Sequence, residues 1–217
     1  MVPNRVIARE AIAPAWEASL ELFLRSEGLN RYDSRGVPCV EIEDLLFDIS
    51  HPVREPRVSS LYPKHLHSLV EDFTSRLIAP QSGQTSIIND RLYRWRLQNG
   101  SVLNQLETVL EMLHDNPDVR YSLVGLWDPE QDLQSSTPVG PLILYPRIRG
   151  GALNLTVVTR TLDAMLGAVQ LIVGFSNLQE HMASILHKGV GHLRVLTLSY
   201  HLHDMDVPLI RSMLDGS

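Results

Sequence analysis

The segment Val157–Gly167 constrains the fold more than any other part of this sequence, because it joins a strand to a helix. Apolar residues over 152–159 predict a strand, and the pattern over 162–187 predicts a long helix in which a break is expected near Gly174. Arg160 and Asp163 lie at the junction between the two. A strand that leads directly into a long helix is typical of a sheet covered by helices.

The rest of the chain alternates between the two periodicities. Apolar residues at helical spacing predict helices over residues 7–27, 66–77 and 102–113. Short apolar runs bounded by turn residues predict strands within 40–49 and over 121–126, 141–148 and 193–202, with Gly150-Gly151 as a hairpin turn. We therefore expect an α+β fold, a mixed sheet covered on one face by long helices. A chain of 217 residues with 44% hydrophobic residues is within the range of a single domain.

Charge and composition limit the partners that this chain can have. The formal net charge is -6 and the isoelectric point is about 5.8, so the clustered basic surface of a nucleic-acid-binding protein is not expected. No apolar run approaches the roughly 20 residues that cross a bilayer, and the N-terminal residues do not resemble a signal peptide. We expect a cytoplasmic protein that binds neither nucleic acid nor membrane.

The chain has nine histidines, but their spacing gives little support for a metal site. Two pairs of histidines are spaced two residues apart: His65 with His67, and His201 with His203. The first pair is expected to open a helix, where residues two apart do not face each other, and the second supplies only two ligands from one strand. We therefore expect hydrogen-bonded histidines and no metal.

The junction segment resembles a motif of the thymidylate synthase and pyrimidine nucleotide hydroxymethylase family. In that family an Arg-Ser/Thr-x-Asp-x-x-Leu-Gly pattern follows a strand, as Arg160-Thr161-Leu162-Asp163 does here. Upstream, 116–121 and 125–129 resemble two further family segments in the expected order. The resemblance covers roughly residues 34–214. It implies a thymidylate-synthase-like domain over 34–217, with which an N-terminal helical segment, 1–33, forms one compact unit, and a homodimer.

The resemblance also implies a set of ligand-binding residues. Arg160 matches the arginine that holds the nucleotide phosphate, Arg35 lies in a Ser-Arg-Gly that resembles the N-terminal phosphate-binding turn, and Arg120 matches an arginine that reaches into the partner subunit's site. Asp163 would support the base and the start of the helix. Tyr200 lies near the family's sugar-binding His-x-Tyr. Without the resemblance, ordinary surface arginines and a first-turn aspartate would explain the same residues.

The family's catalytic cysteine has no counterpart in this sequence. Its position falls on Gly140, and the histidine that follows it falls on Pro141. Thr137 is the nearest hydroxyl, but an alcohol needs an adjacent base to attack C6 of a pyrimidine. Cys39, the single cysteine, lies in an apolar strand, where cysteine usually serves packing. The chain is thus expected to be a divergent member of the family.

Other chemical positions differ as well. The asparagine that reads the pyrimidine falls near Leu171, with Gln170 as its polar neighbour, and the catalytic tyrosine falls near Ile88. Glu71 is the candidate for the carboxylate that organises proton-transfer waters, although a solvated helix glutamate would look the same. The phosphate-binding positions therefore match the family better than the positions that bind the base and carry out the reaction.

Two functions remain open. The chain either acts on a pyrimidine nucleoside monophosphate, or a related modified nucleotide, by a reaction without a cysteine nucleophile, or it is a catalytically silent nucleotide-binding paralogue or partner of an active homologue. The enzyme is favoured, because a fold can keep its pocket while its reaction changes. A reduced folate is the cofactor that the resemblance implies.

Overall fold

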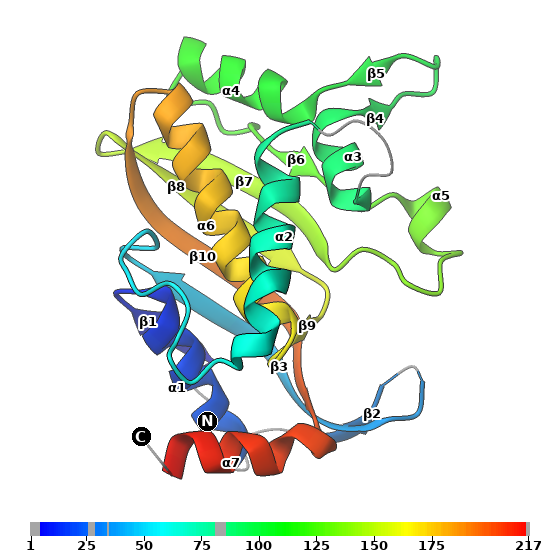
Figure 1. Cartoon of the computed structure of the whole chain (residues 1–217). Helices are drawn as coiled ribbons and strands as arrows, with labels where there is room; N and C mark the ends of the chain where they lie inside the picture. The colour runs from blue at the N-terminus through cyan, green and yellow to red at the C-terminus, as the bar shows by residue number, and fades with distance from the viewer. Residues whose placement is uncertain (1–4, 26–28, 34, 81–85, 216–217) are drawn as a thin grey trace.

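A mixed sheet forms the centre of the molecule (Figure 1). The computed structural model describes residues 5–25, 29–33, 35–80 and 86–215. The strand order is β1 (Val6–Arg9), β3 (Pro38–Ile49), β10 (Gly189–His203), β8 (Ala152–Thr159), β7 (Pro141–Arg149) and β6 (Val124–Gly125). Short strands β2 (Leu29–Tyr32) and β9 (Leu162–Asp163) pair with β3 and β10. A separate hairpin contains β4 (Trp95–Arg96) and β5 (Val102–Leu103).

The sheet contains both parallel and antiparallel pairs. β1 runs parallel to β3, and β10 runs parallel to β8 and β9, whereas the β3–β10, β8–β7 and β7–β6 pairs are antiparallel. The prediction of an α+β fold with a mixed sheet is confirmed.

Long helices lie along one face of the sheet. In Figure 1, α6 (Gly167–Ile185) and α2 (His67–Ile78) lie side by side in front of it, and α1 (Ile12–Leu24) lies nearby. The remaining helices are α3 (Ile87–Tyr93), α4 (Gln105–Asp115), α5 (Pro129–Asp132) and α7 (Val207–Asp215), with 3₁₀ turns at Lys64–Leu66 and Asp204–Asp206. None of the described helices is long and apolar enough to cross a membrane.

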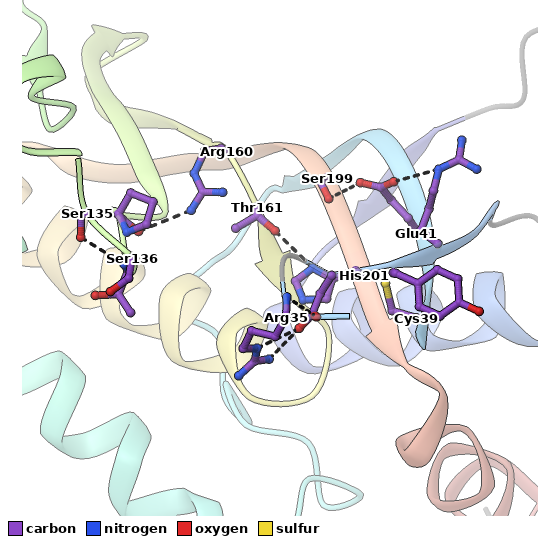
Figure 2. A pocket seen from close by; sticks show the side chains of 14 residues that line it. Arg35, Cys39, Glu41, Ser135, Ser136, Arg160, Thr161, Ser199 and His201 are labelled. Carbon is purple, nitrogen blue, oxygen red and sulfur yellow. Dashed lines mark hydrogen bonds and ion pairs between the residues drawn. The ribbon is translucent and has the colours of Figure 1, made fainter. Parts of the chain in front are cut away.

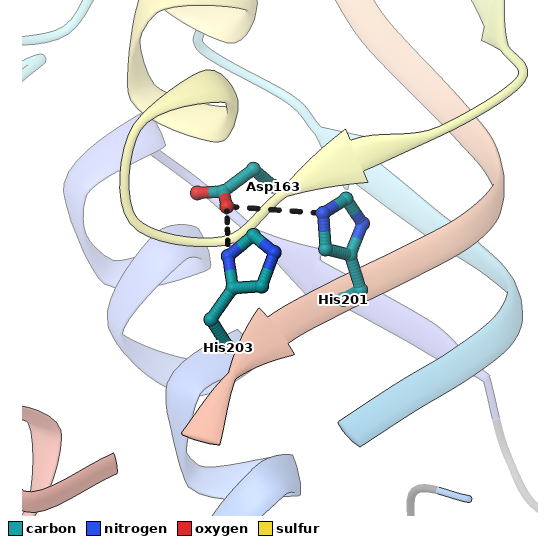
Figure 3. Close-up of side chains that lie close together, drawn as sticks. All are labelled: Asp163, His201 and His203. Atoms are coloured by element: carbon teal, nitrogen blue, oxygen red, sulfur yellow. Dashed lines mark ion pairs between the residues drawn. The ribbon is translucent and has the colours of Figure 1, made fainter. Parts of the chain in front are cut away.

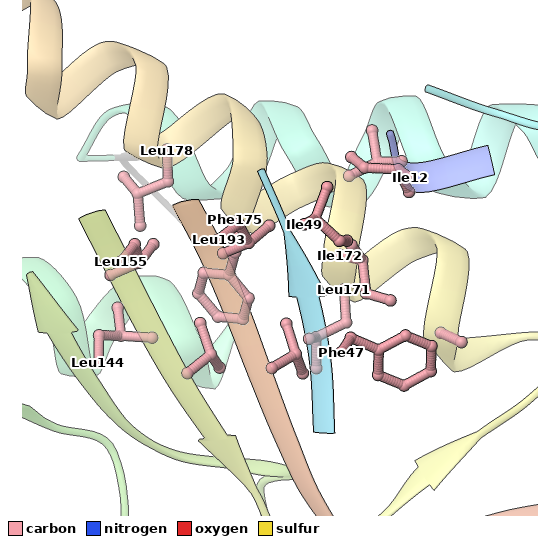
Figure 4. Close-up of a cluster of buried hydrophobic side chains, with 14 of the residues drawn as sticks. Ile12, Phe47, Ile49, Leu144, Leu155, Leu171, Ile172, Phe175, Leu178 and Leu193 are labelled. Carbon is pink, nitrogen blue, oxygen red and sulfur yellow. The ribbon is translucent and has the colours of Figure 1, made fainter. Parts of the chain in front are cut away.

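The core lies between α6 and the sheet (Figure 4). Phe175 and Leu178 of α6 point towards the strands, where Phe47, Leu155 and Leu193 are fully buried. Side chains that alternate with these along the strands are only half-buried, as the two-residue period of a strand requires. This half-buried sheet face comprises Leu46, Asp48, Asn154, Thr156, Val158, Arg194 and Leu196.

The N-terminal region belongs to the same core as the rest of the chain. β1 and β2 both pair with β3, and Trp16 of α1 is fully buried, with its Nε1 donating a 2.8 Å hydrogen bond to the carbonyl of Ala164. Residues 5–25 and 29–33 thus contribute two strands as well as the predicted helix. The single-domain prediction is confirmed. Ser34, at the predicted boundary, lies outside the described residues.

Helix starts were predicted less accurately than helix existence. The first helix begins at Ile12, because Val6–Arg9 forms a strand, and its predicted end at 26–27 lies outside the described residues. The helix predicted from residue 102 begins at Gln105, where the Asn104 side chain accepts a hydrogen bond from the amide of Glu107. Val102 and Leu103 form β5 instead. The strand predicted over 121–126 is reduced to Val124–Gly125.

The junction after β8 also differs in detail. Residues 162–163 form a short strand, so α6 begins at Gly167, and no break occurs at Gly174. A Cβ at Gly174 would lie 2.6 Å from the Phe73 ring of α2, so this glycine allows close helix packing. The Gly150-Gly151 turn is confirmed, with φ values of 57° and 78° that suit a hairpin turn.

Candidate functional site

A large cavity opens beside the end of β10 (Figure 2). Its volume is about 890 Å³, within the range of small-molecule sites. Its walls come from β2, β3, β10, the loop that precedes β7 and the junction after β8. The lining residues are Arg31, Tyr32, Asp33, Arg35, Cys39, Glu41, Ser135, Ser136, Thr137, Pro138, Arg160, Thr161, Ser199 and His201.

Three arginines reach this cavity, but their partners differ. Arg35, with a side chain 73% exposed, forms a 2.8 Å ion pair with Asp33, and Arg31 lies 3.7 Å from Glu41. Arg160 has no ion-pair partner among the described residues. Its Nη2 donates a long 3.4 Å hydrogen bond to the carbonyl of Pro138, and its Nε is buried without a partner in the described part of the chain. Arg160 is therefore the cation best placed to meet an anionic ligand.

Asp33 holds the turn that carries Arg35. Hydrogen bonds from the Val37 amide and from Arg35 keep the pKa of the Asp33 carboxyl well below its usual range. The carboxylate is therefore ionised whenever the protein is folded near neutral pH. From the predicted phosphate-binding turn, Arg35 thus lines the cavity and is already paired with Asp33.

A second, smaller cavity of about 190 Å³ adjoins the first, and Thr161 lines both. Apart from Glu71, it contains the residues that the family resemblance placed at or near the chemical and base-reading positions, although they lie far apart in the sequence. These residues are Ile88, Gly140, Pro141, Asp163, Gln170 and Leu171. The structure therefore brings together the positions that the sequence comparison aligned one by one.

Gly140 lies at the entrance to β7, beside Arg160. Its carbonyl accepts a 2.8 Å hydrogen bond from the Arg160 amide. A Cβ at Gly140 would have its nearest neighbours at 3.5 and 3.6 Å, the Thr161 carbonyl and the Thr159 hydroxyl, which is ordinary contact. A side chain would thus fit, but Gly140 and Pro141 offer no nucleophile to the small cavity.

Cys39 does not replace the missing nucleophile. It lies in the wall of the large cavity but is only 5% exposed. Burial raises the pKa of its thiol, and the negative charges of Glu41, Asp33 and Asp204 raise it further. The thiolate, which is the reactive form, is therefore disfavoured near neutral pH.

Tyr200 and Glu71 lie away from both cavities. Tyr200 is 0% exposed, and its hydroxyl forms a 2.6 Å hydrogen bond with that of Ser19 in the core, where burial raises its pKa. Ser199 and His201 face the cavity in its place, because alternate residues of a strand point to opposite faces. Glu71 is exposed on α2 and lines a third cavity together with Arg57. Neither residue contacts the predicted site in this chain.

Arg120 is exposed and lies outside the two cavities. Its carbonyl accepts a 2.9 Å hydrogen bond from the hydroxyl of Tyr145, a half-buried residue of β7. The backbone of this residue is thus held next to the sheet, and its side chain is exposed.

One buried ion pair was not predicted from the sequence. Arg91 of α3 and Asp132 of α5 form an ion pair, with side chains 5% and 0% exposed. Arg91 also donates to the carbonyl of Leu126, and Asp132 accepts from the amides of Asp128 and Val139. These bonds fix the loop that supplies Ser135–Pro138 to the large cavity. The sequence feature that could have indicated this pair is the two aspartates Asp128 and Asp132, of which Asp128 caps α5.

Three potential metal ligands lie next to the large cavity, at the end of β10. Asp163, His201 and His203 present ligand atoms within 4.8 Å of one another. The sequence interpretation counted only the two histidines on one strand. It did not place Asp163 beside them, which follows from the pairing of β9 with β10.

Comparison with known proteins agrees with the fold. A family model described as Thymidylate synthase matches residues 82–216. A protein named "Putative thymidylate synthase" from Methanosarcina barkeri is 26% identical over 217 residues, 98% of this chain and 96% of that protein. One of the same name from Methanocaldococcus jannaschii is 26% identical over 179 residues, 79% of each chain. A thymidylate synthase from Listeria monocytogenes is 23% identical over 167 residues, 74% of this chain and 52% of that protein.

Proposed function

The chain belongs to the thymidylate synthase family, and from this membership we propose that it binds a pyrimidine nucleoside monophosphate, or a related modified nucleotide, across the two adjoining cavities. We further propose that it acts on this nucleotide by chemistry that uses no cysteine thiolate.

Arg160 is the observation that carries the proposal. Its guanidinium borders the large cavity with a buried Nε that has no partner among the described residues. Guanidinium groups match phosphate oxygens bidentately and keep their charge at all physiological pH values. A phosphate in the large cavity would supply the missing acceptor, with Arg35 as a second cation at the rim.

The small cavity suits the base end of the ligand. Thr161 connects it to the large cavity, so one molecule could extend from Arg160 to Asp163. Apolar side chains, including those of Ile88 and Leu171, would contact the faces of a ring, and Asp163 and Gln170 would offer polar contacts to its edge.

Folate-dependent methyl transfer does not fit the residues at this position. The thymidylate synthase family uses folate, and its reaction begins with a thiolate that activates the pyrimidine. Gly140 and Pro141 provide none, and Cys39 is buried with a raised pKa. We therefore assign no step to a folate.

A homodimer would complete the site. The half-buried sheet face leaves apolar and charged side chains together on the central strands, and Arg120 extends from the same part of the molecule. We propose that two copies pack through this face and that Arg120 serves the partner's phosphate.

Calorimetric titration with pyrimidine nucleoside monophosphates tests the binding. Arg160→Ala should weaken affinity about 10- to 150-fold, since hydrogen bonds to a charged group contribute about 1.5–3 kcal/mol. Arg76→Ala is the matched control, because Arg76 pairs with Asp72 on the exposed side of α2 and should leave the affinity unchanged. If no such nucleotide binds, or if Arg160→Ala has no effect, the proposed pocket is wrong.

Release of tritium from 5-tritiated deoxyuridylate and deoxycytidylate tests the chemistry. Release in the absence of folate would support a reaction at C5 without the conventional cofactor. Binding without release would instead support the second function, a silent paralogue. In that case, mixing with a cysteine-bearing homologue should produce heterodimers detectable by native mass spectrometry.

A further inference from the structure

Three side chains capable of metal coordination meet at the end of β10 (Figure 3). Asp163 lies on β9, directly opposite His201 in the parallel pairing, and His203 follows on the same face of β10. Asp163 Oδ2 lies 3.8 Å from His201 Nε2 and 3.2 Å from His203 Nδ1. Tetrahedral zinc sites have bonds of about 2.0–2.1 Å, which place neighbouring ligand atoms about 3.4 Å apart. The two observed distances lie on either side of that value.

The other polar atoms of all three side chains already have partners. Asp163 Oδ1 accepts hydrogen bonds from the amides of Met165 and Leu166, at 2.9 and 2.6 Å. His201 Nδ1 lies 3.2 Å from the Thr161 hydroxyl, and His203 Nε2 lies 3.4 Å from Asp33 Oδ2. The atoms left over are therefore the three that converge.

This pattern is the one that surrounds a protein-bound metal. A ligating histidine usually donates its second ring N–H to a carboxylate, a backbone carbonyl or water, which fixes its tautomer and its orientation. The Asp33 carboxylate is placed for that role, and the Thr161 hydroxyl lies where such a water would bind. An ordinary histidine–aspartate ion pair would not require a second partner for each ring.

Burial and charge also favour a cation. The side chains of Asp163, His201 and His203 are 13–19% exposed. Asp33 Oδ2 lies 3.4 Å from His203 Nε2, so a second carboxylate adjoins the cluster. Two carboxylates therefore lie beside the two imidazoles, an arrangement that favours a bound cation.

We propose that Asp163, His201 and His203 form a site for a divalent transition metal, with Zn²⁺ as the best match to two imidazoles and one carboxylate. Three protein ligands leave a fourth position for water or ligand. Because His201 also lines the large cavity, that position would face the proposed nucleotide site. The proposal does not depend on nucleotide binding.

Metal titration of the full chain tests the site directly. After treatment with a chelator, the protein should bind one equivalent of Zn²⁺ by calorimetry, and Co²⁺ should give the intense visible absorption of a tetrahedral complex. His203→Ala should weaken Zn²⁺ binding by more than the about 10- to 100-fold that loss of an outer-shell partner costs. Asp163→Asn, which keeps the side-chain size, provides a second variant if His203→Ala does not fold.

His192→Gln is the matched control. His192 lies on the same strand, and its Nδ1 is 2.8 Å from Asp48 Oδ1, but the described residues offer it no second histidine and carboxylate in the same arrangement. This variant should bind Zn²⁺ like the unaltered chain. Much less than one equivalent of metal, an octahedral Co²⁺ spectrum, or equal losses in His192→Gln and His203→Ala would overturn the proposal. All titrations are made without nucleotide, so their failure is separate from failure of the proposed function.

Discussion

The buried pair of Arg91 and Asp132 links stability to the shape of the large cavity. A buried charge is tolerated only when its partner is present, and removal of one partner leaves the other unpaired. Here the pair also holds the loop that supplies Pro138, whose carbonyl contacts Arg160. Stability and ligand binding should thus decline together.

Asp132→Ala should reduce the free energy of unfolding by about 3–5 kcal/mol, because the Arg91 guanidinium stays buried without its counterion. Urea denaturation measures this change. Asp72→Ala removes the exposed partner of Arg76 and serves as the control, with an expected loss of about 1 kcal/mol or less. Similar losses in both variants would show that burial of the pair does not matter.

The same pair should make stability sensitive to acid. Burial alone raises the pKa of Asp132, but hydrogen bonds from Arg91 and from the Asp128 and Val139 amides outweigh it, so the pKa is lowered. A lowered folded-state pKa means that the carboxylate stabilises the fold above its unfolded pKa of about 3.9 and that this contribution disappears as the pH falls further. The stability difference from Asp132→Ala should therefore be constant near neutrality and shrink below about pH 4.

Some residues that the sequence motifs grouped together also lie close together in the structure, although their roles in ligand binding stay a prediction. Arg160, Arg35 and Gly140 all lie at the two cavities, as expected from the motif order. The prediction failed for Tyr200, because a shift of one residue along a strand exchanges the core face for the cavity face. The contact between His203 and Asp33 could not be predicted from the sequence, because it depends on how β10 lies beside the turn before β3.

At the scale of elements, α6 and α2 approach each other closely at Gly174. Gly174→Ala would gain about 1 kcal/mol of helix propensity, but its Cβ would lie 2.6 Å from the Phe73 ring. Because overpacking typically costs about 1–3 kcal/mol, we expect a net loss of stability of up to about 2 kcal/mol by thermal or urea unfolding.

Two further variants separate packing from propensity. Phe73→Leu in the Gly174→Ala background should recover part of the loss, because the smaller side chain can move away. Gly167→Ala, at the first position of α6, meets its nearest atoms at 3.5 and 3.6 Å and should change stability by less than about 0.5 kcal/mol. Equal effects at Gly167 and Gly174 would contradict the packing argument.

Helices and hairpins followed from periodicity, but their ends did not. The pattern of 102–113 continues smoothly through Asn104, so only the capping bond to Glu107 reveals where the helix starts. Gly174 looked like a helix breaker, because the sequence does not show that Phe73 packs against it. Tertiary contacts of this kind override local propensity.

At the scale of the whole molecule, the half-buried sheet face is the surface on which the proposed dimer depends. Leu196 lies on β10 within this face. Leu196→Glu would place a charge in each half of a symmetric interface, so light scattering should change from a dimer to a monomer. Leu209→Glu, on the exposed side of α7, should leave the dimer intact. A monomer in the unaltered chain would exclude the dimer outright.

The order of the strands in the sheet could not be predicted from the sequence alone. The strands were predicted individually, yet the order β1-β3-β10-β8-β7-β6 depends on pairings between residues more than a hundred positions apart, such as β3 with β10. Those pairings also create the site, since they bring residues near positions 35, 140, 160 and 200 to one end of the sheet.

The two sides of the large cavity differ in how strongly the sheet holds them. β10 is paired with β3 along one edge and with β8 and β9 along the other, whereas β2 is exposed and pairs with β3. Backbone amides in doubly paired strands exchange with solvent mainly through global unfolding, and those at a short edge exchange through local opening. The backbone of Tyr200 and His201 pairs with β3 on one side and with β9 on the other, so its amides should exchange slowly. The amides of Arg31 and Tyr32, on the exposed strand β2, should exchange faster, so hydrogen exchange would distinguish the two walls of the cavity.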